Sequence, residues 1–159
     1  MTLTEKDKEN IQKTWALVRV DSVQAGIELF RRFFEANPDY VKVFPFDDCK
    51  DLNEILKSST LKMHAGRVMT ALSSIVDNLN DPILFQENLG KIITSHVERN
   101  IELRQFENLK MALVGLLIDK LGNDIMNDET KEAWSKAYDV ILDTYKKSKE
   151  NHSRSSSSL

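Results

Sequence analysis

Two apolar stripes, each a set of side chains on one face of an expected helix, constrain the fold more than any other feature. Between residues 61 and 96, apolar side chains recur at steps of three and four, the spacing that places them on one helix face. The whole sequence holds only five glycines and three prolines, so few positions interrupt such helices. Each stripe includes one histidine. The first stripe is Leu61, His64, Val68, Leu72, Ile75 and Leu79, and the second is Leu89, Ile92, Ile93 and His96.

The helical pattern continues on both sides of this stretch. No segment alternates with the period of two that a half-buried strand requires. We therefore predict an all-α fold built from six long helices plus short turns. The expected helices cover about residues 4–21, 22–37, 58–79, 82–98, 106–121 and 128–147.

A serine-rich segment follows the last expected helix. Residues 148–159 read SKENHSRSSSSL and offer almost nothing apolar to bury. Polar segments of this kind stay disordered because burial cannot offset the entropy of ordering them. We assign residues 1–147 to one globular domain and predict that residues 148–159 form a disordered tail.

Charge and composition argue against several kinds of partner. Acids and bases are interleaved and the net charge is −3, so no basic face indicates nucleic-acid binding. The apolar runs are too short to cross a bilayer, and the polar start of the chain does not resemble a signal peptide. One cysteine, Cys49, cannot form an internal disulfide, so we expect a cytoplasmic protein. The sequence leaves the role of Cys49 open.

His64 and His96 carry the chemical information, because each lies on an otherwise apolar stripe. Each imidazole has two nitrogens that need partners. Two such rings on different helices predict a group between them, and a planar iron cofactor would satisfy both. At each position the alternative is a core histidine bonded to a backbone carbonyl. For the whole chain, the alternative is a helical interaction module without a cofactor.

Two other chemistries fit the sequence poorly. Structural zinc sites use four Cys or His ligands at short local spacings, whereas only two separated histidines are available here. Hydrolysis by serine or cysteine needs a nucleophile, a base and an orienting group, and no such set is evident.

One ordered set of residues spans most of the chain. In order, its members are Trp15, Gly26, Pro38, Phe44, His64, Val68, His96 and the segment AWSKAYDVI at residues 133–141. This order resembles the globin family over residues 3–147. The resemblance implies a globin fold around a haem pocket, with Gly26 as the small residue that lets the second helix cross the helix of His64 closely.

Two features resemble a subset of globins. His64 and His96 are 32 positions apart (96 minus 64), a spacing similar to that of neuroglobin, cytoglobin and several intracellular invertebrate haemoglobins. Phe30 also matches neuroglobin. The cysteine pair of neuroglobin is reduced here to Cys49, so the resemblance implies no internal disulfide switch.

On the proximal side, the resemblance makes His96 the ligand of the iron of haem b. Its Nδ1–H is expected to donate to the carbonyl of Ile92 or to the hydroxyl of Ser95, which leaves Nε2 for the metal. Phe106, at the start of the following helix, is a further expected cofactor contact.

On the distal side, the resemblance places His64 across the haem plane. His64 would either donate a hydrogen bond to a bound ligand or compete as a sixth iron ligand, and both readings stay open. Phe44 is expected to pack against the haem, Val68 to limit the space beside the ligand and Phe30 to exclude water. Arg67 could reach a haem propionate.

The resemblance implies reversible binding of dioxygen, and of carbon monoxide and nitric oxide, for oxygen storage, transport or buffering without enzymatic turnover. The alternative is a haem redox enzyme or sensor, such as a nitric oxide dioxygenase or nitrite reductase. That alternative needs a separate reductase, because no G-x-G-x-x-G segment is fused to the chain. We expect a monomer or a homodimer.

Overall fold

The computed structural model describes residues 2–44 and 51–157, and their secondary structure is helical. Six helices are long, as the sequence predicted, and α3 adds one short turn before α4. The α-helices are α1 (Glu5–Val18), α2 (Ser22–Ala36), α3 (Leu52–Lys57), α4 (Ser59–Asp77), α5 (Pro82–Glu98), α6 (Leu103–Ile125) and α7 (Asp128–Ser157). Two 3-10 segments, Arg19–Asp21 and Pro38–Val43, complete the described elements.

Polar caps fix where several helices begin. The hydroxyl of Thr4 accepts from the N–H of Asp7 at 3.0 Å, and the Asp7 carboxylate accepts from the N–H of Thr4 at 2.9 Å. This reciprocal box satisfies two backbone donors that a helix start leaves unpaired. At the start of α4 the hydroxyl of Ser58 accepts from one backbone N–H, and Asp81 precedes Pro82 at the start of α5. Local sequence therefore sets these boundaries.

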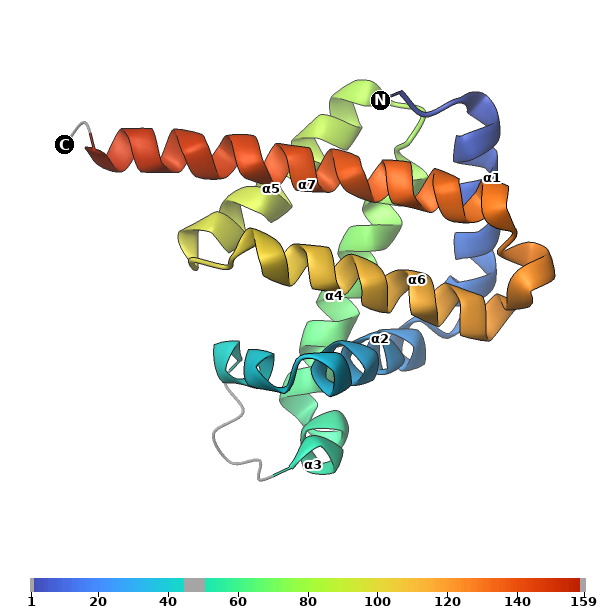
Figure 1. The fold of residues 1–159 in the computed structure, drawn as a ribbon, viewed down its shortest axis with the longest axis horizontal. Coiled ribbons are helices and arrows are strands. Elements are labelled where there is room, and N and C mark those ends of the chain that lie inside the picture. Colours follow the sequence, from blue (N-terminus) through green and yellow to red (C-terminus); the bar gives the residue numbers. More distant parts are fainter. Residues whose placement is uncertain (1, 45–50, 158–159) are drawn as a thin grey trace.

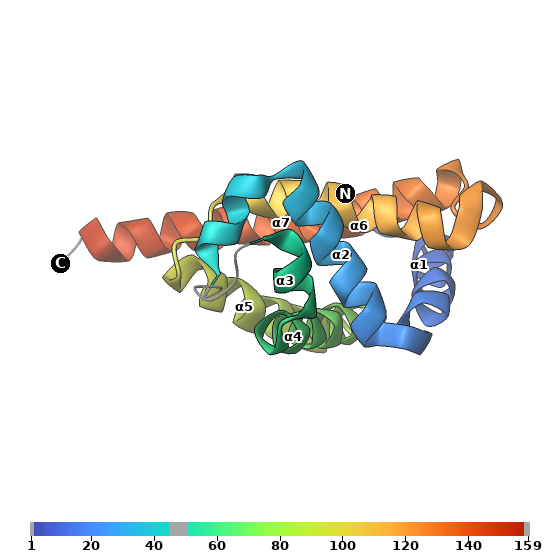
Figure 2. The ribbon, with the colours of Figure 1, turned by 90° about the horizontal axis from the view of Figure 1, so that it is seen from below.

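The helices pack in two crossing layers. α6 and α7 lie side by side, and α4 and α5 cross behind them (Figure 1). In the perpendicular view, α4 and α5 lie below α6 and α7 (Figure 2). α2 contacts both α4 and α6, so it links the two layers.

Gly26 allows α2 and α4 to approach closely, as expected. A Cβ atom built on Gly26 would lie 2.9 Å from Cγ of Met69 and 3.0 Å from both Cβ and the carbonyl oxygen of Ala65. These separations are shorter than van der Waals contact. Any side chain at position 26 would therefore push α4, and with it His64, away from α2.

The core beyond this crossing is anchored by the two tryptophans of the sequence. Trp15 and Trp134 lie with ring centroids 5.8 Å apart and are almost fully buried. Each indole N–H donates to a hydroxyl, Trp15 to Ser73 and Trp134 to Thr14. Because every buried indole donor is satisfied, the rings join α1, α4 and α7 without leaving an unpaired N–H.

The end of α6 and the length of α7 complete the fold. Gly122 has a φ of +81°, so the regular part of α6 stops there, directly after the helix end predicted at about residue 121. α7 then runs to Ser157 and projects beyond the body (Figures 1 and 2). Residues 148–157 are thus helical where a disordered tail was predicted. No proline or glycine lies between residues 123 and 157 to end the helix.

This projecting segment still lacks a core. Tyr145 is the last buried residue of α7, and the described side chains beyond it are exposed or, at Ser148, half-buried. A domain limit near residue 147 therefore remains a prediction about where packing ends. In the described parts of the chain, no helix is both long and apolar enough to span a membrane.

Candidate haem site

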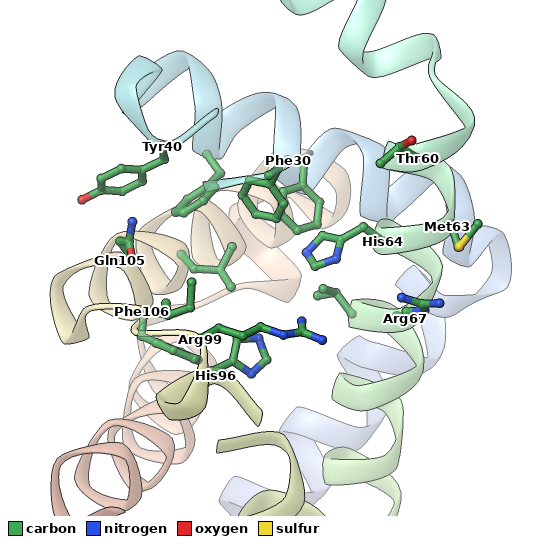
Figure 3. Close-up of a pocket in the computed structure, with 15 residues that line it drawn as sticks. Phe30, Tyr40, Thr60, Met63, His64, Arg67, His96, Arg99, Gln105 and Phe106 are labelled. Carbon is green, nitrogen blue, oxygen red and sulfur yellow. The ribbon is translucent and has the colours of Figure 1, made fainter. Parts of the chain in front are cut away.

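A cavity of about 640 Å³ opens among α2, α4, α5 and α6. Its volume lies within the range of roughly 300–1,000 Å³ that is typical of cofactor and ligand pockets. His64 and His96 lie on opposite sides of it (Figure 3). Most of its lining is apolar or aromatic. Among the expected contacts, the lining includes Phe30, Phe44, His64, Arg67, Val68, His96 and Phe106.

His64 is held by aromatic contacts rather than by hydrogen bonds. Its ring centroid lies 4.8 Å from that of Phe44, nearly edge-on, and 5.1 Å from that of Phe30. Within residues 2–44 and 51–157, no protein group is hydrogen-bonded to either ring nitrogen. Both nitrogens are therefore available to whatever enters the cavity.

The environment of His64 keeps its imidazole neutral at physiological pH. Burial is the main cause that lowers the pKa of His64 to about 4, and the electrostatic influence of His96, Arg67 and Arg99 lowers it further. A neutral imidazole carries one N–H donor and one lone pair. His64 can therefore donate a hydrogen bond to a ligand or coordinate a metal without first losing a proton.

His96 lies in the last turn of α5, and the backbone beyond it is tightly folded. Asn100 adopts a left-handed φ of 59°, which an asparagine tolerates. The N–H of Ile101 then donates back to the carbonyl of His96 at 3.2 Å. This turn fixes the end of α5 next to the cavity.

The predicted hydrogen bond between His96 and Ile92 is present. Nδ1 of His96 lies 2.7 Å from the carbonyl oxygen of Ile92. A carbonyl can only accept, so Nδ1 carries the hydrogen and Nε2 keeps its lone pair. Ser95 makes no hydrogen bond to His96 within the described chain, so of the two expected partners the ring uses the carbonyl. Neither Ile92 nor Ser95 lines the cavity.

Two arginines lie at the edge of the cavity. Arg67 of α4 and Arg99, just after α5, both line it and both are exposed. Neither forms an ion pair with a described residue. Figure 3 shows Arg67 on α4 near Met63, and Arg99 beside His96 with its guanidinium group extending toward Arg67. They place positive charge where an anionic group of a cofactor would meet solvent.

Sequence reasoning missed one end of the cavity. Tyr40, Gln105 and Leu109 also line it, and the hydroxyl of Tyr40 accepts from the side chain of Asn108 at 2.6 Å. Gln105 and Leu109 are four apart, and Leu109 follows Phe106 by three positions, so helical spacing alone could have identified them. Tyr40 lies in a 3-10 segment, where no such periodicity points inward. Cys49 lies outside the described residues.

These features fit a large planar group better than a bare metal ion. In the described residues, no cluster of three or more His, Cys, Asp or Glu side chains could hold a metal ion. Two imidazoles instead face an apolar cavity, and one has its tautomer fixed with Nε2 free. The fold and the site together define an all-α protein with a pocket suited to a haem-like cofactor.

Comparison with known proteins gives the family. The globin family profile matches residues 27–145. Cytoglobin-2 of Danio rerio is 32% identical over 136 residues, which cover 84% of this chain and 75% of that protein. The chain therefore belongs to the globin family, whose members bind haem and gaseous ligands.

Other relatives carry different names. Neuroglobin of Dissostichus mawsoni is 26% identical over 141 residues, with 88% of each chain covered. An anaerobic nitrite reductase of Gossypium hirsutum is 28% identical over 156 residues, which cover 96% of this chain and 97% of that protein. The similarity thus extends to a relative that is named for an enzyme activity.

Proposed function

We propose that this globin holds haem b through His96 and binds dioxygen reversibly, for oxygen storage, transport or buffering. Carbon monoxide and nitric oxide are further proposed ligands. Haem b supplies a ferrous iron that takes up diatomic gases. The observation that carries the proposal is a largely apolar cavity with His64 and His96 on opposite sides, His96 being tied to Ile92 through Nδ1.

His96 acts in this proposal as the protein's bond to the iron. Its Nδ1–H donates to the Ile92 carbonyl at 2.7 Å, so its Nε2 lone pair is oriented and basic. Phe30, Phe44 and Val68 keep the opposite side apolar. They exclude water, which would otherwise assist oxidation of the ferrous state.

His64 acts on the ligand side. Because burial keeps it neutral, it presents an N–H to the ligand without adding a charge to the pocket. The hydrogen bond from this N–H to bound dioxygen would be partly charge-assisted. Bonds of that kind are worth roughly 1.5–3 kcal/mol, or about 10- to 150-fold in affinity. Arg67 is proposed to bind a haem propionate at the cavity edge.

One absorption spectrum of the ferrous protein tests the haem assignment. The purified protein should show a porphyrin Soret band. His96→Ala should lose stably bound haem, while His152→Ala, which changes an exposed histidine of α7, should retain it. Haem retention by His96→Ala at the wild-type level would remove His96 from its proposed role.

His64→Leu distinguishes the two roles of His64. If His64 donates to the ligand, the variant should release dioxygen about 10- to 150-fold faster, in line with the hydrogen-bond energy. If His64 occupies the sixth position, the wild-type ferrous spectrum should be low-spin. The variant should then become high-spin and bind carbon monoxide faster, because His64 no longer competes with carbon monoxide for the iron.

Nitrite reduction is the second candidate function, because relatives include plant proteins named anaerobic nitrite reductases. Conversion of nitrite to nitric oxide takes up one electron and two protons and releases one water, so it needs a separate reductase. Sustained nitric oxide production with a cellular reductase under anoxia would support this activity. Slow dioxygen release with little autoxidation would support storage.

Location and assembly complete the proposal. A single cysteine in the sequence fits a reducing cytoplasm, where unpaired thiols persist. We propose a monomer or homodimer there, and sedimentation of the haem-loaded protein over a concentration series would distinguish them.

A further inference from the structure

The ring of His96 packs nearly edge-on against the ring of Phe106. The ring centroids of His96 and Phe106 lie 5.2 Å apart, and the planes meet at 72° (Figure 3). The Ile92 carbonyl fixes only Nδ1. The tilt of the imidazole about that bond therefore depends on where the Phe106 ring lies.

Phe106 is in turn held by α7 at two points. The hydroxyl of Tyr138 donates to the carbonyl oxygen of Phe106 at 2.8 Å. The ring of Tyr145 packs on the ring of Phe106, with centroids 4.6 Å apart and planes at 38°. Tyr138 and Tyr145 are seven residues apart, which places them on the same face of α7. One contact holds the backbone of Phe106 and the other its ring.

Tyr145 acts through its ring and not through its hydroxyl. The residue is 0% exposed, and its hydroxyl has no hydrogen-bond partner among the described residues. A buried hydroxyl without a partner is unfavourable for folding, so polar bonding does not explain this tyrosine. His96, Phe106 and Tyr145 thus form a series of packed rings. Nζ of Lys149 lies 5.9 Å from the centroid of the Tyr145 ring, so this aromatic series ends at a surface lysine.

We infer that Tyr145 is a positioning residue for His96. It fixes the Phe106 ring, and that ring fixes the tilt of the imidazole that the proposed function assigns to iron. The inference rests on that assignment for its effect on haem, but the aromatic series itself exists without the cofactor. It can therefore be tested separately in the haem-free and haem-loaded protein.

The haem-free test uses nuclear magnetic resonance of the full chain. In the wild type, nuclear Overhauser effects should join the Phe106 ring to both the His96 and Tyr145 rings, and their absence would overturn the inference. Tyr145→Leu should shift the His96 ring-proton resonances, because Phe106 loses its support. Tyr145→Phe keeps the ring and should leave them unchanged.

Trp134→Phe serves as the matched control. It weakens a buried contact between α7 and α1 outside the cavity lining, where Trp134 bonds to Thr14, so it reproduces a general loss of stability. The His96 resonances should not move in this variant. Equal shifts in Trp134→Phe and Tyr145→Leu would show that only global packing matters.

The haem-loaded test measures the iron–histidine stretching band of the ferrous protein, in a His64→Leu background so that the distal position is open. Tyr145→Leu should shift this band and speed haem loss to apomyoglobin several-fold, whereas Tyr145→Phe should match the parent. An unchanged band in Tyr145→Leu would overturn the inference. Absence of the band in the parent would instead contradict the proposed role of His96, while the haem-free resonances still test the aromatic series.

Discussion

Gly26 lies at the crossing of α2 and α4, where the two backbones leave no room for a methyl group. The nearest obstacles to a Cβ are the side chain of Met69 and the carbonyl oxygen of Ala65. A methionine side chain can rotate away, but a helix carbonyl cannot move without moving α4. His64 lies on α4, one residue before Ala65, so this contact also sets the position of His64.

Gly26→Ala should therefore destabilise the fold, although alanine favours helix by about 1 kcal/mol over glycine. Overpacking at a tight crossing costs typically about 1–3 kcal/mol, so we expect a net loss of up to about 2 kcal/mol in the free energy of unfolding. Urea denaturation monitored by circular dichroism measures it. Gly90→Ala is the control, because no atom lies within 4 Å of a Cβ there, and it should be neutral or stabilising.

Individual site residues differ in how far the sequence could place them. The bond from His96 to Ile92 was predictable because it spans four residues of one helix. The choice of Ile92 over Ser95 depends on the rotamer of His96, which tertiary packing sets. The contact between Tyr145 and Phe106 joins segments 39 positions apart (145 minus 106), and no local pattern encodes it.

At the scale of elements, α1 shows how one cap links a helix to the rest of the protein. The Asp7 carboxylate accepts from Thr4 within the capping box and also from Lys136 of α7 at 3.1 Å. Asp7 is almost fully buried. The backbone N–H of Thr4 is the main cause of the lowered pKa of Asp7, and Lys136 adds to it.

The lowered pKa of Asp7 predicts a pH dependence of stability. A carboxyl whose pKa is lower in the folded state stabilises the fold above its unfolded pKa of about 3.9. This contribution is lost as the pH falls through the lower, folded pKa. Asp7→Ala removes hydrogen bonds to a charged carboxylate and should cost about 1.5–3 kcal/mol at pH 7, and its deficit relative to wild type should shrink below about pH 4.

Thermal or urea unfolding between pH 2 and 7 measures this deficit. Glu5→Ala is the control, because Glu5 is also an acid in the first turn of α1 but its side chain is exposed. A deficit for Asp7→Ala that stays constant down to pH 2 would contradict the assigned pKa shift.

Element boundaries were predictable where a local signal exists and not elsewhere. Thr4, Pro82 and Gly122 each act within a turn of their own position, and the helices start or break beside them. The length of α7 was not predictable in this way. After Tyr145 the sequence offers neither a core to pack on nor a glycine or proline to stop the helix, so polarity was the only signal, and it suggested disorder.

At the scale of the whole molecule, the projecting part of α7 should be dispensable for folding. Deleting residues 150–159 keeps Lys149 over the Tyr145 ring and removes described side chains that are exposed. Changes confined to the surface usually shift stability by less than about 0.5 kcal/mol. The melting temperature of the haem-free protein should therefore match the full chain, and a clear decrease would show that the segment packs on the body.

The two tryptophans have a practical consequence. Trp15 and Trp134 account for all the indole groups of the chain, and both lie in one buried pair. Tryptophan fluorescence from this protein therefore originates at a single internal position. A porphyrin that entered the cavity would absorb that emission. Quenching of the tryptophan fluorescence would therefore report haem binding without an added label.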